Sequence, residues 1–214
     1  GLSIRGSDNG GGHGGAIYAS GAPDCMILEC RLYENQRGIE LENTSAVWLE
    51  GNRVSANLGD GLRVDATAGT RILGNLIYGN GGDGIELARA STDLGLEFNT
   101  LYRNAGDQIR ESVTGNTGLV ANNILTEGAG RGLGLAGSST LGTNANLAWL
   151  QTGNTPASTY SADPLLADPF GADGILGGIG AADDDFRVEL LSPTLDAGMI
   201  EARRVALRLA GSLT

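Results

Sequence analysis

The sequence contains no lysine, one histidine and few aromatic residues, and each shortage excludes some chemistry. All 14 basic residues are arginines, so a Schiff base and a lysine-containing phosphate loop are excluded. Because His13 is the single histidine, neither a catalytic triad nor a histidine-rich metal site is expected, and we interpret it as a loop residue. Charged residues make up only 18% of the chain, which does not suit a helical bundle. No apolar run approaches the ~18 residues that a membrane span needs.

The net charge and the first residue bear on which binding partners are expected. Against 14 basic residues stand 25 acidic ones, giving a net charge of −11 that argues against a nucleic-acid partner. The sequence starts at Gly1 without a signal peptide, which is typical of a mature or excised segment. Further domains of a longer chain are therefore one expected partner.

Glycine is abundant, with 36 residues, and recurs at a fixed spacing. Apolar–polar–apolar triplets follow residues 15, 38, 61, 84, 108 and 132, which are separated by 23 or 24 positions. Two asparagine columns share this period: Asn52, Asn75, Asn99 and Asn122, preceded by Cys30, and Asn35, Asn57, Asn80 and Asn104. Alternating inward pairs lie between the columns, among them Val47/Leu49, Leu94/Leu96 and Thr117/Leu119, and a further apolar position follows, namely Leu32, Val54, Ile77, Leu101 and Ile124.

This pattern predicts three very short strands in each repeat, separated by glycine and asparagine turns. No segment has helical periodicity long enough to cross a sheet. We therefore predict an all-β fold, a right-handed single-stranded parallel β-helix of about six coils of 22–24 residues, with coils about 4.8 Å apart. The repeats are assigned to residues 1–150 and an irregular C-terminal cap to residues 151–214, because a solenoid must cover its open end.

The repeats resemble the pectate-lyase-like β-helix superfamily over roughly residues 13–150. Residues 163–198, including the run from Ser192 to Gly198, resemble the "SPAIDAG"-type closing segment of secreted bacterial β-helix proteins. The resemblance implies an extracellular or cell-surface bacterial protein that interacts with polysaccharide. It is specific for architecture and not for activity, since lyases, hydrolases, epimerases and adhesins share the fold.

The first strand of each coil points one residue outward, and these residues form the column Tyr18, Glu40, Arg63, Glu86, Arg110 and Gly134. Just before the turn, Asp60, Asp83 and Asp107 form an acidic column with Arg37 and Arg131 at its ends. Stacked carboxylates repel one another, so raised pKa values are expected there, as a general acid requires. Asp83, Asp107 and Arg110 are the candidate catalytic residues, and Asp60, Arg63, Glu86 and Glu40 the candidate substrate contacts. A purely structural column of aspartates in turns is the alternative.

Two further features are candidates for binding. Trp48 falls on the outward phase of its strand, where it would stack on sugar rings or lie under a loop. Asp168, Asp173, Asp183 and Asp185 lie among glycines in the C-terminal segment, a composition that suits calcium, with a solvated acidic loop as the alternative.

Two functions remain open at this point. The first is an extracellular carbohydrate-interacting β-helix that uses the Asp/Arg face, with lyase or hydrolase activity as one form of it. The second is a non-catalytic, structural or adhesin-like solenoid segment.

Overall fold

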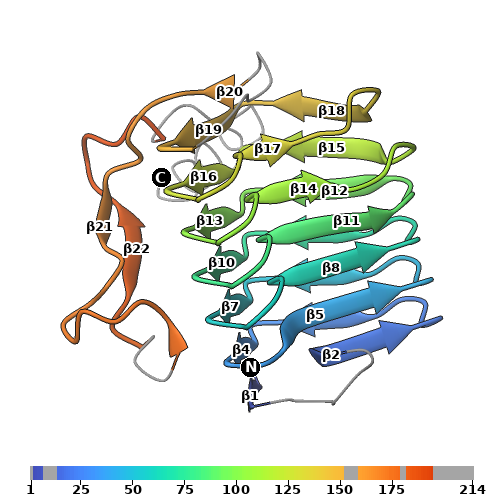
Figure 1. Cartoon of the computed structure of the whole chain (residues 1–214), viewed down its shortest axis with the longest axis horizontal. Coiled ribbons are helices and arrows are strands. Elements are labelled where there is room, and N and C mark those ends of the chain that lie inside the picture. The colour runs from blue at the N-terminus through green and yellow to red at the C-terminus, as the bar shows by residue number, and fades with distance from the viewer. Residues whose placement is uncertain (1, 7–13, 152–158, 179–181, 195–214) are drawn as a thin grey trace, which may run out of the picture.

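The chain winds into a stack of coils whose strands form three parallel sheets (Figure 1). The computed structural model describes residues 2–6, 14–151, 159–178 and 182–194. Within them every regular element is a strand except for isolated turns, and no helix is long and apolar enough to cross a bilayer. The predicted all-β parallel β-helix of about six coils is confirmed.

Sheet A contains β1 (Ser3–Arg5), β4 (Arg31–Tyr33), β7 (Arg53–Ser55), β10 (Leu76–Tyr78), β13 (Thr100–Tyr102), β16 (Ile124–Thr126), β19 (Asn146–Trp149) and β20 (Thr159–Tyr160). Sheet B contains β2 (Gly15–Ser20), β5 (Arg37–Glu42), β8 (Leu62–Asp65), β11 (Ile85–Arg89), β14 (Ile109–Glu111) and β17 (Leu133–Gly134). Sheet C contains β3 (Met26–Leu28), β6 (Trp48–Glu50), β9 (Arg71–Leu73), β12 (Leu94–Glu97), β15 (Thr117–Ala121) and β18 (Thr140–Asn144). Sheets B and C thus take one strand from each of six successive coils, and sheet A has eight strands.

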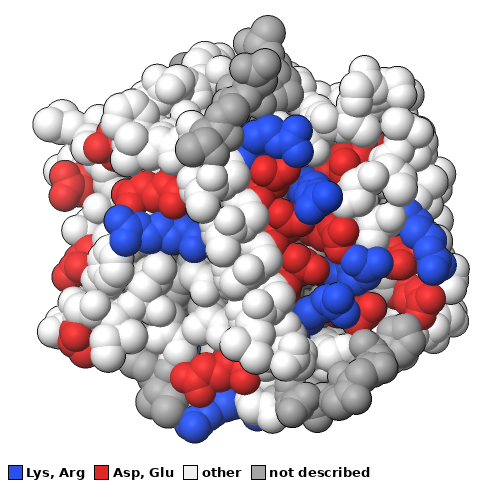
Figure 2. All heavy atoms as spheres, in the orientation of Figure 1, with Lys and Arg blue, Asp and Glu red and all other residues white. Residues whose placement is uncertain are grey.

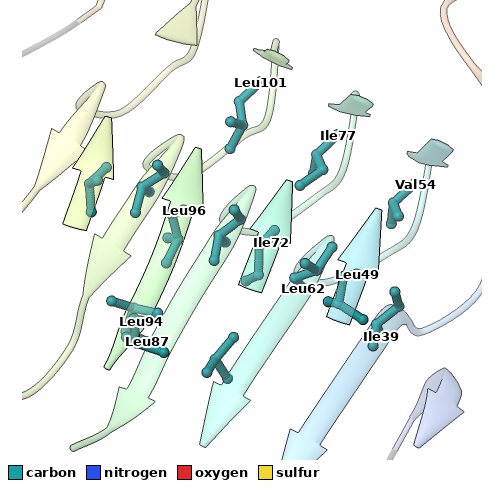
Figure 3. Close-up of a cluster of buried hydrophobic side chains, with 14 of the residues drawn as sticks. Ile39, Leu49, Val54, Leu62, Ile72, Ile77, Leu87, Leu94, Leu96 and Leu101 are labelled. Atoms are coloured by element: carbon teal, nitrogen blue, oxygen red, sulfur yellow. The ribbon is translucent and has the colours of Figure 1, made fainter. Parts of the chain in front are cut away.

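The core is a column of aliphatic side chains that fills the space between the three sheets (Figure 3). Equivalent residues of successive coils lie in register, as in the series Ile39, Leu62, Ile85, Ile109 and Leu133. All of these side chains are at least 98% buried. The period of the sequence is therefore the period of the core.

The glycine column has a steric cause. A Cβ on Gly61 would lie 2.7 Å from the carbonyl oxygen of Gly84 and 2.6 Å from the Ile77 side chain. In the same way, a Cβ on Gly84 would lie 2.5 Å from the carbonyl oxygen of Gln108. Because each coil passes so close to the next at this corner, any side chain would push the coils apart.

The asparagine columns are buried hydrogen-bonded ladders. The Asn57 amide donates to Asn80 Oδ1 at 2.9 Å, and Asn80 Oδ1 also accepts the backbone N–H of Asn57 at 3.1 Å. Asn52, Asn75 and Asn99 repeat this pattern in the other column. The columns identified in the sequence are therefore confirmed for these residues, and their side-chain amides bind one coil to the next.

The register of one coil differs from the prediction by one residue. The ladder continues from Asn99 to Asn123 and not to Asn122, and Leu96 lies beside Val120 and not Leu119. The inward position after the ladder is Leu125, fully buried, in place of Ile124. The predicted Thr117/Leu119, Asn122 and Ile124 are therefore wrong by one residue, because the spacing between these two coils is 24 residues, with Leu87 beside Glu111 and Leu94 beside Gly118, where the prediction used 23.

The described part of the C-terminal segment lies mainly beside the coils and not over their end. The antiparallel strands β21 (Leu166–Asp168) and β22 (Asp185–Val188) run along sheet A (Figure 1). Phe186 packs against Tyr78 and Tyr102, with ring centroids 4.6 and 5.5 Å apart. The buried Asp184 accepts hydrogen bonds from the Tyr78 hydroxyl and the Gly177 N–H at 2.8 and 2.9 Å. This part of the segment thus covers a side of the solenoid, while β20 is the one strand of the described residues that extends sheet A beyond β19.

Candidate functional site

The outward face of sheet B carries most of the candidate site. Figure 2 shows its acidic and basic side chains gathered over β5, β8, β11 and β14. The predicted outward column is confirmed by the strand register, in which Glu40 lies beside Arg63, Arg63 beside Glu86 and Glu86 beside Arg110. Residues far apart in sequence therefore form one wall of alternating charge.

The aspartate column is tied into the backbone of the coils. Asp60 Oδ1 accepts the N–H of Asp83 at 2.9 Å, and Asp83 Oδ1 accepts the N–H of Asp107 at 2.7 Å. Asp107 Oδ1 in turn accepts the N–H of Arg131 at 2.7 Å. One oxygen of each of these three carboxylates therefore binds a backbone N–H of the next coil.

The second oxygen of each aspartate faces a guanidinium. Asp60 Oδ2 lies 3.5 Å from Arg37, and Asp83 Oδ2 lies 3.5 Å from Arg110. The Asp107 carboxylate binds Arg131 at 2.8 Å. The predicted flanking of the acidic column by arginines is present at all three positions.

Arg63 lies at the centre of the ion pairs on this face. It lies 3.8 Å from Glu40 and 3.5 Å from Asp65, and it also contacts Glu86. A second oxygen of Glu86 accepts the Ser112 hydroxyl at 2.9 Å. The candidate substrate contacts Glu86 and Glu40 thus both pair with Arg63.

A further charged column was missed by the sequence reasoning. Asp65 lies beside Glu42 across β5 and β8, and Arg89 lies 3.3 Å from Asp65 and 3.9 Å from Glu42. An irregular register between Leu87 and Arg89 brings Arg89 beside Asp65. The outward phase of Glu42 and Asp65, two residues beyond Glu40 and Arg63, was the signal that could have revealed them.

The face has two layers of opposite charge. The carboxylate side chains lie low, with exposed fractions from 7% at Asp65 to 22% at Glu42. Three arginines rise above them: Arg110 is 50% exposed, Arg131 45% and Arg89 61%. Although the protein is acidic overall, the most exposed charged side chains of this group are guanidinium groups.

The surroundings of Asp83 change the acidity of this carboxyl. Its burial raises the pKa of Asp83 above the usual range, and the neighbouring charges of Asp60 and Asp107 add to this effect. The N–H of Asp107 and the charge of Arg110 act in the opposite direction but are outweighed. The raised pKa expected for this column is thus present at Asp83.

Trp48 does not belong to this face. It lies in β6 of sheet C, between Met26 and Arg71 of the adjacent strands. The indole is 38% exposed, and its N–H donates to Glu50 Oε2 at 2.7 Å. The predicted outward phase of Trp48 is confirmed, but the indole lies on a different sheet from the Asp/Arg face, because consecutive strands of a coil belong to different sheets. Its stacking on sugar rings stays a prediction.

The four aspartates proposed for calcium have other contacts. Asp185 binds Arg187 at 2.6 Å, and hydrogen bonds from this guanidinium lower the pKa of Asp185 to about 2. Asp183 Oδ2 accepts the N–H of Asp173 at 3.1 Å, while Asp168 lies opposite Asp185 in the hairpin. In the described ranges no three acidic, histidine or cysteine residues converge as a metal site would require. Calcium binding stays a prediction, and His13 lies outside the described residues.

Three comparisons place the chain among known proteins. Residues 1–148 match the family model described as "Right handed beta helix region". Among solved structures, the periplasmic alginate epimerase AlgG (T265N mutant) is 14% identical with a TM-score of 0.34; the match covers 77% of this chain and 42% of that one. The fluoroquinolone resistance protein QnrB1 is 11% identical with a TM-score of 0.20, over 76% of this chain and 92% of that one.

Two properties of these matches limit what they show. The chain spans less than half the length of the epimerase, and at these TM-scores neither structure bears on function. A search of the curated proteins finds no match. The resemblances to the pectate-lyase-like superfamily and to the bacterial closing segment stay predictions.

Proposed function

This chain belongs to the right-handed β-helix family, and we propose that it binds an acidic polysaccharide on the outward face of sheet B. The observation that carries the proposal is the layer of exposed arginines, Arg89, Arg110 and Arg131, above a floor of carboxylates. Guanidinium groups bind carboxylates through paired, charge-assisted hydrogen bonds. The carboxylates beneath hold the arginines in place and can accept hydrogen bonds from sugar hydroxyls.

The arrangement of the strands suits a polymer better than a small molecule. Side chains on this wall repeat with each coil, at about 4.8 Å, so a chain of sugars lying along the stack meets similar groups again and again. Many weak contacts then add up in one ligand. An extracellular location is part of the proposal, since such polymers lie outside the cell.

Affinity electrophoresis in gels containing polygalacturonate, alginate or a neutral glucan tests the proposal. We expect the two uronic-acid polymers to retard the protein and the neutral glucan to leave its mobility unchanged. Retardation should weaken with added salt, because charged contacts at an exposed face are screened. Parallel gels with calcium and with a chelator show whether calcium bridges the polymer.

Matched variants locate the binding. The double variant Arg110→Gln/Arg131→Gln should lose retardation by at least about tenfold in apparent affinity, since each charge-assisted bond contributes about 1.5–3 kcal/mol before solvent screening. Arg71→Gln on sheet C, whose guanidinium binds Asp93 at 2.9 Å, serves as the control. Retardation lost equally in both variants, or absent in the wild type, would contradict the proposal.

The same samples test for turnover by Asp83, Asp107 and Arg110. Unsaturated products or new reducing ends that disappear in Asp83→Asn would establish lyase or hydrolase activity. Binding without products identifies a binding module.

A second function is favoured by a different observation. The aspartate oxygens that accept backbone N–H groups bind coil to coil, as a structural solenoid would use them. If no polymer binds and Asp107→Ala lowers stability, the non-catalytic structural or adhesin-like function is supported instead.

A further inference from the structure

A small cavity of about 60 Å³ lies between the first strands of sheet A and the C-terminal segment. Its floor is formed by Ser3, Arg31, Arg53, Tyr33 and Ser55, and Gly178 and Ala182 line it from the other side. This volume is several times the roughly 10–15 Å³ that one water needs. The cavity lies on a different sheet from the proposed polysaccharide face and is independent of it.

The polar groups of this cavity share one property, since every polar side chain that lines it can donate a hydrogen bond. Two arginines supply guanidinium groups, and Ser3, Tyr33 and Ser55 supply hydroxyls. No carboxylate is among the described residues that line it. In a protein of net charge −11, a pocket made of donors is a local reversal of sign.

The two arginines lie directly beside each other. Arg31 of β4 is in register with Arg53 of β7, and like charges at such cross-strand positions destabilise a sheet. Arg53 donates to the backbone carbonyl of Asp184 at 3.0 Å. Arg31 makes no ion pair with any residue that the structure describes, so this guanidinium charge is not compensated there.

Two carboxylates border this region, Glu34 and Asp184, and each is bound by other groups through one of its oxygens. Glu34 binds Arg5 at 3.0 Å, and the Asp184 Oδ2 atom accepts the Tyr78 hydroxyl and the Gly177 N–H. An anion in the cavity would face both guanidinium groups at once and turn their repulsion into a shared attraction.

We propose that the cavity beneath Gly178 binds a small tetrahedral oxyanion through Arg31, Arg53, Tyr33 and Ser55. Free phosphate or sulfate and the sulfate ester of a sugar share this chemistry. Four oxygens suit the several donors of the floor better than the two oxygens of a carboxylate do. Since the C-terminal segment forms one wall, the anion also joins that segment to the coils.

Thermal unfolding and titration calorimetry of the whole chain test this proposal. The probes are sodium phosphate, sodium sulfate and glucose 6-sulfate, and sodium chloride holds the ionic strength constant. Sodium acetate, whose carboxylate is planar, is the comparison anion. We expect phosphate or sulfate to raise the Tm of the wild type, because a ligand that binds only the folded state stabilises it. Acetate should have a smaller effect.

Variants separate this site from general salt effects. Arg31→Gln should weaken oxyanion binding by about tenfold or more and remove the rise in Tm, while Arg71→Gln should respond like the wild type. Without the anion, Arg31→Gln should unfold no earlier than the wild type, because a like-charged pair is lost. Tyr33→Phe, which keeps the ring, should weaken binding several-fold and serves if Arg31→Gln does not fold.

Binding of glucose 6-sulfate that depends on Arg31 identifies an ester-borne group, and binding of the inorganic ions alone identifies a free oxyanion; either supports the site. No heat and no change in Tm for any probe, or an equal response from Arg31→Gln, would overturn it.

Discussion

The adjacent residues Asn122 and Asn123 give a sharp test of the register of the coils. In the structure Asn123 is buried in the amide ladder, while Asn122 occupies the turn with a φ of +57°. Asn123 Oδ1 accepts the backbone N–H of Asn99 at 2.9 Å, and its amide donates to the Leu96 carbonyl at 2.8 Å. The two neighbours should therefore respond differently to substitution.

The expected magnitudes follow from the hydrogen bonds that each variant removes. Asn123→Ala leaves the Asn99 N–H without its acceptor and takes a donor from Leu96, so the free energy of unfolding should fall by about 2–5 kcal/mol. Asn122→Gly places glycine where φ is positive, which glycine adopts freely, and should change the free energy of unfolding by less than about 1 kcal/mol.

Urea unfolding followed by circular dichroism measures both, using the shift of the midpoint with the slope as a check on the transition. Asn144→Ala, at an exposed position of β18, is a control expected to stay within about 0.5 kcal/mol. Equal losses for Asn122→Gly and Asn123→Ala, or a larger loss for Asn122→Gly, would refute the register and with it the column assignments.

Three further predictions concern the corner, the C-terminal segment and the acidic column. Gly61→Ala should destabilise by about 1–3 kcal/mol in urea because its Cβ meets the next coil, while Gly137→Ala, with open space around it, should be neutral; equal effects would contradict the steric account. Phe186→Ala removes the ring between Tyr78 and Tyr102, so limited proteolysis should cleave the C-terminal segment before the coils, and unchanged cleavage would speak against this packing. Asp83→Asn should raise Tm at neutral pH, since a raised folded pKa means stability that is present at low pH and lost as pH rises through that pKa; this advantage should shrink on acidification, and an advantage that grows instead would contradict the buried-charge argument.

The repeat made much of the fold predictable from sequence. Glycine at one corner and asparagine at two others meet the same contact between neighbouring coils in every repeat, so residues such as Gly61 and Asn80 recur with the period and mark the coils in the sequence. The same period placed Glu40, Arg63, Glu86 and Arg110 on one wall. Between Asn99 and Asn123 the spacing is 24 residues, and a count of 23 placed the column one residue too early.

Other features depended on contacts that a period cannot reveal. The lateral packing of the C-terminal segment rests on Phe186 and Asp184 meeting Tyr78, more than 100 positions apart in the chain. Trp48 has the correct phase but lies on another sheet, because phase gives inward or outward and not the side of the solenoid. The period also places Arg31 beside Arg53, but a binding role for this pair is suggested only by the cavity that both residues line.

Mapping of amide chemical shifts by two-dimensional NMR during titration with an oligogalacturonate tests the proposed function most directly. The account predicts that the largest changes fall on β8, β11 and β14 and on the turns that carry Asp83, Asp107 and Arg131. Changes centred on Trp48 and sheet C, or a spectrum unaltered at saturating sugar, would contradict it.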